Sequence, residues 1–94
     1  MRVRRVALDV DRAVDRPDVL QIAGAIEQVP GVEGVNITVA EIDMETVGMD
    51  LTVEGDGIDV KALIAAIEKS GAAVHSIDEL VAGSRVVERV RRSR

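Results

Sequence analysis

Carboxylates and a single histidine are the side chains of this sequence that could carry chemistry. His75 is the only histidine among 94 residues. An imidazole beside carboxylates can ligate a divalent cation or act as a general base, and oxygen ligands suit calcium or magnesium. Carboxylates gather in three places: Asp9 with Asp11, Glu41 with Asp43 and Glu45, and Asp78 with Glu79. The residues predicted to bind a divalent cation are Glu41, Asp43, Glu45, Asp9 and His75. The other interpretation is a solvated acidic surface, because no loop has the spacing of an EF-hand.

Enzyme activity is not expected. The chain has no cysteine, so it offers no thiolate nucleophile, and it has neither a Gly-x-Ser-x-Gly turn nor a glycine-rich phosphate loop. A competing hypothesis makes His75 and Asp9 an acid and a base, and it requires turnover that His75→Ala abolishes. Single-stranded RNA is not an expected ligand either, because the chain has no aromatic residue on which bases could stack. The longest apolar run, Ala62–Ile67, is too short for a membrane helix, and we expect a cytoplasmic protein.

The charges are strongly segregated along the chain. The net charge is −5, yet all ten arginines lie in residues 2–16 and 85–94. Residues 17–84 contain thirteen Asp and Glu against only Lys61 and Lys69. Two surfaces of opposite sign would attract copies of the same chain head to tail, which predicts a homo-oligomer that closes as a ring if the rotation permits. The alternative is a solvated surface on which the signs happen to separate.

Hydrophobic periodicity predicts four strands and two helices around these residues. Alternation of apolar and polar side chains predicts strands at residues 3–11, 35–43, 47–54 and 73–81. Apolar residues at helical spacing predict one helix from Val19 that stops before Val29–Gly31, and a second after the N-cap Asp59 that ends at Ser70 and Gly71.

An internal repeat at an offset of 41 residues indicates how these elements fold. The pattern from Asp18 to Glu27 recurs from Asp59 to Glu68, and the strands match in the same register. Two such halves predict an α+β, ferredoxin-like βαββαβ sandwich, with a four-stranded antiparallel sheet in the order 4-1-3-2 and two helices on one face. We expect one domain, residues 1–83, followed by a basic C-terminal extension, residues 84–94. Arg5 is expected near Asp50 on the uncovered face.

Three motifs carry a family resemblance: Gly31–Thr38, Glu41–Thr46 and His75–Gly83. In these segments the chain resembles the archaeal domain of unknown function 211 family, small proteins without an established activity. The resemblance implies a ferredoxin-like fold, an archaeal origin and ring-like homo-oligomers, and it is compatible with divalent ions such as calcium. It supplies no catalytic residue. The arginine-rich C-terminus and the Asp15–Asp18 turn depart from the family's usual segments.

A second, local resemblance gives the alternative hypothesis. The segment Asp15–Leu20, followed later by Gly34–Ile37, is similar to the opening of an ACT domain, a module of the same fold that binds amino acids between paired subunits. Those domains usually have glycine at the position of Asp18. The leading prediction is a non-enzymatic, self-assembling cytoplasmic protein whose partner is itself and whose acidic sites bind a divalent cation. The alternative is a regulatory module that senses a small metabolite such as an amino acid.

Overall fold

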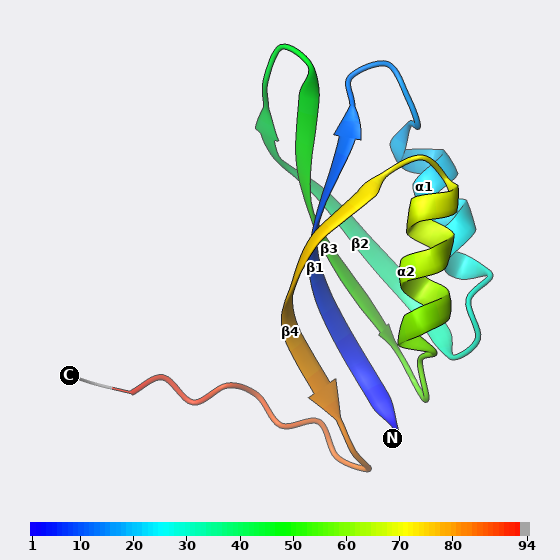
Figure 1. Ribbon diagram of the computed structural model, residues 1–94. Coiled ribbons are helices and arrows are strands. Elements are labelled where there is room, and N and C mark those ends of the chain that lie inside the picture. Colours follow the sequence, from blue (N-terminus) through cyan, green and yellow to red (C-terminus); the bar gives the residue numbers. More distant parts are fainter. Residues whose placement is uncertain (93–94) are drawn as a thin grey trace.

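The fold is a four-stranded antiparallel sheet covered on one face by two helices (Figure 1). A computed structural model describes residues 1–92. The strands lie in the order β2-β3-β1-β4, so the predicted ferredoxin-like topology and strand order are confirmed. The elements follow one another as β1 (Val3–Ala13), α1 (Val19–Glu27), β2 (Val32–Ile42), β3 (Thr46–Gly55), α2 (Val60–Lys69) and β4 (Ala73–Ala82).

The strands are longer than side-chain alternation predicts, although β2 stops at Ile42, just before its predicted end at residue 43. β2 begins at Val32, not at residue 35, because Val32 already pairs with Gly55 of β3. The same sheet pairing carries β1 to Ala13, opposite Thr46. Backbone pairing needs no alternation of side chains, so the pattern underestimates the strands' lengths.

Each helix begins at an aspartate cap. The Asp18 carboxylate accepts a hydrogen bond from the Gln21 backbone amide at 2.8 Å, and the Gln21 side chain accepts one from the Asp18 amide at 2.9 Å. Asp59 caps α2 as predicted, accepting from the Ala62 amide at 3.1 Å. Such caps satisfy amides that the first helical turn leaves without partners. Within residues 1–92, no helix is long and apolar enough to cross a membrane.

The core between sheet and helices is entirely aliphatic. One face of β1 and β3 and the inner face of each helix contribute its fully buried side chains, which are Val6, Leu8, Val10, Ile22, Ile26, Met49, Leu51, Val53, Leu63 and Ile67. Among residues 1–92, no polar or charged residue is buried. The helices therefore take up the apolar face of the sheet, and the charged side chains of β1 and β3 are left on the other face.

Two glycines allow the start of β2 to approach the end of β3. Gly31 has a φ of +88°, and its carbonyl accepts a hydrogen bond from the Asp56 amide at 2.9 Å. A Cβ atom added at Gly55 would collide with that carbonyl. The close approach therefore requires glycine at position 55.

We predict that Gly55→Ala destabilises the protein by about 1–3 kcal/mol, because the added methyl group forces two backbones apart. Gly34→Ala is the matched control, since a Cβ at this β2 position meets nothing within 4 Å. Its effect should stay within about 0.5 kcal/mol. Urea unfolding of both variants measures the difference, and equal losses would contradict the packing explanation.

Candidate functional site on the open face of the sheet

The face of the sheet opposite the helices contains an acidic hollow of about 460 Å³. Three neighbouring strands supply its carboxylates: β1 provides Asp9 and Asp11, β3 provides Asp50, and β2 provides Glu41. His75, near the start of β4, also lines the hollow. The prediction that His75 lies near Asp9 and Asp11 is confirmed.

Strand register places two of these carboxylates directly against each other. Asp9 is paired with Asp50 across the β1–β3 ladder, and like charges at opposed positions of a sheet are destabilising. None of the four carboxylates of the hollow forms an ion pair with lysine or arginine in the part of the chain that the structure describes. The hollow therefore favours a positively charged occupant.

The structure separates the residues that the sequence predicts as cation ligands. Asp9, Glu41 and His75 share the hollow, but Asp43 and Glu45 belong to the β2–β3 turn. The Asp43 side chain accepts a hydrogen bond from the Met44 amide at 2.7 Å. Glu45 lines a different, shallower depression. The reason is that β2 ends at Ile42, so the alternation that would place positions 41, 43 and 45 on one face stops there.

Sequence reasoning places Asp50 on this open face, but beside Arg5 and not opposite Asp9. The register of β1 against β3 would have identified it, but this register is not visible in a pattern of alternating side chains. Over residues 1–92, no three His, Asp or Glu side chains are arranged so that they could hold a metal ion. The divalent-cation site stays a prediction.

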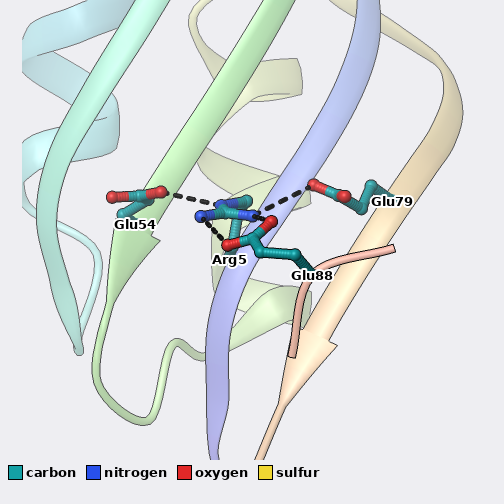
Figure 2. A network of polar contacts seen from close by, with 4 residues as sticks. All are labelled: Arg5, Glu54, Glu79 and Glu88. Atoms are coloured by element: carbon teal, nitrogen blue, oxygen red, sulfur yellow. Dashed lines mark hydrogen bonds and ion pairs between the residues drawn. The ribbon is translucent and has the colours of Figure 1, made fainter. Parts of the chain in front are cut away.

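The expected contact between Arg5 and Asp50 is wrong, because Arg5 is paired with Glu54 across β1 and β3. Figure 2 shows the guanidinium among three carboxylates. Arg5 Nε donates to Glu54 Oε2 at 2.7 Å, and Nη1 and Nη2 donate to the two oxygens of Glu88 at 2.9 and 3.1 Å. Glu79 of β4 lies 3.7 Å from Nη1. Arg5 thus joins both neighbouring strands to the segment that follows β4.

This C-terminal segment is held to the sheet as far as residue 88. The Gly83 amide donates to the Arg2 carbonyl at 2.7 Å, and the Arg4 guanidinium donates to the Ser84 carbonyl at 3.1 Å. Its described residues, 84–92, contain neither helix nor strand. The segment is therefore attached by arginines of β1 and its N-terminal flank, and not by sheet pairing.

The two surface ion pairs at this end of the sheet shift the pKa of their carboxyls. Hydrogen bonds from Arg5 hold the pKa of Glu88 below its usual range, and hydrogen bonds from Arg2 do the same to the pKa of Asp56. The same contacts raise the pKa of both arginines. Arg2 and Arg5 are thus paired with carboxylates of their own molecule, whereas the described residues offer no such cation to the carboxylates of the hollow.

Comparison with known proteins gives two matches. Residues 4–94 match the DUF211 family, described as uncharacterized ArCR. The uncharacterized protein MJ0319 of Methanocaldococcus jannaschii is 39% identical over 89 residues, which make up 95% of this chain and 91% of that protein. Neither description names an activity.

We predict that acid detaches the C-terminal segment. Glu88 has a lowered pKa in the folded protein, so its attachment to Arg5 is complete above the ordinary glutamate pKa of about 4.3 and is lost as the pH falls through the lower, folded-state value. Backbone ¹⁵N relaxation of residues 84–88 should report order at pH 7 and its loss at low pH.

Glu88→Gln should release the segment already at pH 7, because the neutral amide cannot form the bidentate ion pair. Glu68→Gln, an exposed carboxyl on α2, removes the same charge and should leave the segment ordered. A segment that stays rigid in Glu88→Gln would show that this ion pair does not hold it.

Proposed function

Since the chain belongs to the DUF211 family of uncharacterised proteins, we propose its function from its own surfaces: it is a non-enzymatic, cytoplasmic protein that assembles with copies of itself, edge strand to edge strand. The observation that carries this proposal is that the outer sides of both edge strands, β2 and β4, are unpaired and expose apolar side chains. β2 and β4 each pair on one side only, and each bears part-exposed apolar side chains. An edge in this condition is a template for pairing with another chain.

The apolar side chains of both edges belong to the same layer. On β4, Ile77 and Leu80 are 46% and 49% exposed, and they stand opposite the buried Leu8 and Val6. On β2, Val39 is 45% exposed and stands opposite the buried Met49. Paired residues point to the same face of a sheet, so both rows lie on the helix side. Joining β2 of one copy to β4 of the next would bring the two rows together and remove both from water.

Strand direction permits such a junction without turning the second copy over. Every pair within the sheet is antiparallel, so β2 runs with β1, and β4 runs against both. A second copy in the same orientation therefore places its β2 antiparallel to β4 of the first, with the helices of both on one side. The contact is heterologous, and it closes as a ring if the rotation between copies divides a full turn.

Neither edge strand contains lysine or proline, although register shifts interrupt the pairing of both with their inner neighbours and both carry carboxylates. Soluble proteins commonly block edge strands with lysine or proline, but residues 32–42 and 73–82 contain no Lys, Arg or Pro. In the antiparallel junction the end of β4 lies beside the start of β2, so the arginines that follow β4 do not meet Asp43 and Glu45. The proposed junction therefore rests on its apolar side chains and not on opposite charges at the two edges.

The acidic hollow gives such an assembly a place for positive charge. The sequence predicts a divalent cation, calcium or magnesium, at Glu41, Asp43, Glu45, Asp9 and His75, of which Asp9, Glu41 and His75 line the hollow. In the described residues these side chains are not arranged as a metal site, so a cation there would require them to move. Native mass spectrometry counts subunits and retains tightly bound ions in one measurement, so it tests the assembly and the cation together.

We predict that the wild-type protein appears in native mass spectra and light scattering as a species several times its 10.0 kDa chain mass. Leu80→Lys places a charge in the proposed junction and should weaken assembly about tenfold or more. Val14→Lys is the control, because Val14 is 48% exposed but lies in the loop after β1. A wild-type protein that remains at 10.0 kDa in low and moderate salt would refute the proposed function.

A second candidate function is supported by a hollow beside the β1–α1 turn. It has a volume of about 450 Å³ and is lined by Asp15, Arg16, Gln21 and Ser70 among others. Opposite charges side by side suit the ammonium and carboxylate groups of an amino acid. Asp18 uses its carboxylate to cap α1, so its presence in place of the usual glycine does not put a charge into this hollow. These features favour an ACT-like sensor of a small metabolite.

If this second function holds, one or more amino acids should raise the melting temperature, with stabilisation of about 2.7 kcal/mol at a hundred times the dissociation constant. Arg16→Gln should abolish the response, because the variant loses the partner of the carboxylate. Arg85→Gln removes an arginine elsewhere and should retain it. A thermal shift assay with all twenty amino acids decides the matter, and no response from the wild-type protein would exclude an amino-acid sensor.

A further inference from the structure

We infer that the groove between β4 and the C-terminal segment receives the start of β2 of a second copy, whose Glu33 pairs with Arg89. The inference rests on the proposed function and deepens it, because it names the polar contact that fixes the register of the junction between copies. The two surfaces involved lie at opposite edges of one molecule. One is a groove that ends in an arginine, and the other is a strand that begins with an unpaired glutamate.

The groove lies where the C-terminal segment crosses the last residues of β4, and its volume is about 360 Å³. Residues 79–82 of β4 form one wall, and residues 87–89 of the segment form the other. The apolar side chains Leu80 and Val87 are 49% and 62% exposed at this place. Because β4 is an edge strand, the groove lies at the margin of the sheet, where a second strand would add.

Arg5 positions the arginine of this groove. Its Nη1 and Nη2 donate to both carboxylate oxygens of Glu88 at 2.9 and 3.1 Å (Figure 2), so the next residue, Arg89, is held against β4. Arg89 is exposed and forms no ion pair with any residue in the described part of the chain. Glu79 also lines the groove, but it lies 3.7 Å from Arg5 Nη1. The groove therefore offers one free positive charge, that of Arg89.

Glu33 provides the opposite charge at the start of β2. It is the extra residue of a bulge, because Glu33 and Gly34 together stand opposite the single Glu54 of β3. Glu54 is already paired with Arg5, whereas Glu33 is exposed and has no lysine or arginine partner within residues 1–92. Its carboxylate is therefore available to a neighbour.

Strand direction brings these two groups together across the junction. The end of β4 lies beside the start of the neighbour's β2, because the added strand is antiparallel. If Leu80 lies beside Val35 of the neighbour, the neighbour's Glu33 falls opposite Ala82. If Leu80 lies beside Ile37 instead, Glu33 falls two residues further along, where the C-terminal segment begins. Both positions adjoin the groove that Arg89 lines.

The same contact cannot form within one molecule. β2 and β4 are opposite edges of the sheet with β3 and β1 between them, which separates them by about 14 Å at the usual spacing of strands. An ion pair between Glu33 and Arg89 therefore joins two copies.

Apolar contact alone leaves the register of the junction open. Leu80 can meet any of three apolar residues of β2, at positions 35, 37 and 39, because a slip of two residues keeps every side chain on its own face. A charge pair at one end of the junction favours the registers that bring its members together, which is the usual role of electrostatic complementarity at an interface.

Charge reversal tests the contact. Glu33→Arg and Arg89→Glu each place like charges at the junction, and each variant should assemble about three- to tenfold more weakly than the wild type. The double variant Glu33→Arg/Arg89→Glu should recover wild-type assembly, because every junction then regains opposite charges. Sedimentation velocity over a range of protein concentrations measures the assembly, and circular dichroism checks that each variant keeps its fold.

Matched controls separate this contact from net charge. Glu68→Arg on α2 and Arg92→Glu beyond the groove make the same changes of charge at exposed positions, and both should assemble like the wild type. Glu88→Gln adds a test of positioning, because Glu88 pairs with Arg5 inside the molecule and only holds Arg89 in place. This variant should assemble several-fold more weakly, whereas Glu68→Gln should not.

The outcomes distinguish the inference from the proposed function. If the wild type assembles and both charge-reversal variants do so equally well, the inference is wrong and the proposed function stands. If the wild type is monomeric, both fail. Weak assembly of the single variants without recovery in the double variant would show that the two charges do not meet. Full assembly of Glu88→Gln with a released segment would show that Arg89 does not act from the groove, and it too would overturn the inference.

Discussion

The register of β1 against β3 determines the arrangement of charge on this molecule. With Arg5 paired to Glu54 and Asp9 paired to Asp50, one end of the open face holds a neutralised arginine and the other holds facing carboxylates. The same register brings Leu8 against Leu51 and Val10 against Met49 beneath the helices. A slip by one residue would exchange the two faces and expose the core. Packing of the apolar face against the helices fixes this register, and the register in turn fixes where the charged side chains lie on the opposite face.

The sequence predicts the elements and their order because these depend on periodicity. Alternation in the strands, helical spacing after Asp18 and Asp59, and the 41-residue repeat each recur at a fixed interval. Cross-strand partners do not follow from an interval. Arg5 opposite Glu54 and Arg5 opposite Asp50 differ by a slip of four residues, and an even slip leaves every side chain on its own face. Alternation therefore placed Arg5 on the correct face and gave it the wrong partner.

The candidate site was partly predictable for a related reason. His75 and Asp9 could be brought together from topology, because the start of β4 must lie near the end of β1 in this fold. The grouping of Glu41 with Asp43 and Glu45 assumed that β2 continues, but the chain turns after Ile42. The place where a strand gives way to a hairpin turn depends on hydrogen bonds such as that from the Asp43 amide to the Thr46 carbonyl at 2.8 Å. Side-chain type alone does not reveal these bonds.

Glu88 determines which part of the C-terminal segment is held against the sheet. It is the only acidic residue among the last ten, which also contain five arginines. An uninterrupted basic segment would be attracted to the acidic hollow of its own sheet, because an intramolecular partner is present at a high effective concentration. The ion pair of Glu88 with Arg5 holds the first half of the segment at the opposite end of the open face. Residues 89–92, which are exposed and lead away from the sheet (Figure 1), are thereby kept apart from the carboxylates of their own hollow.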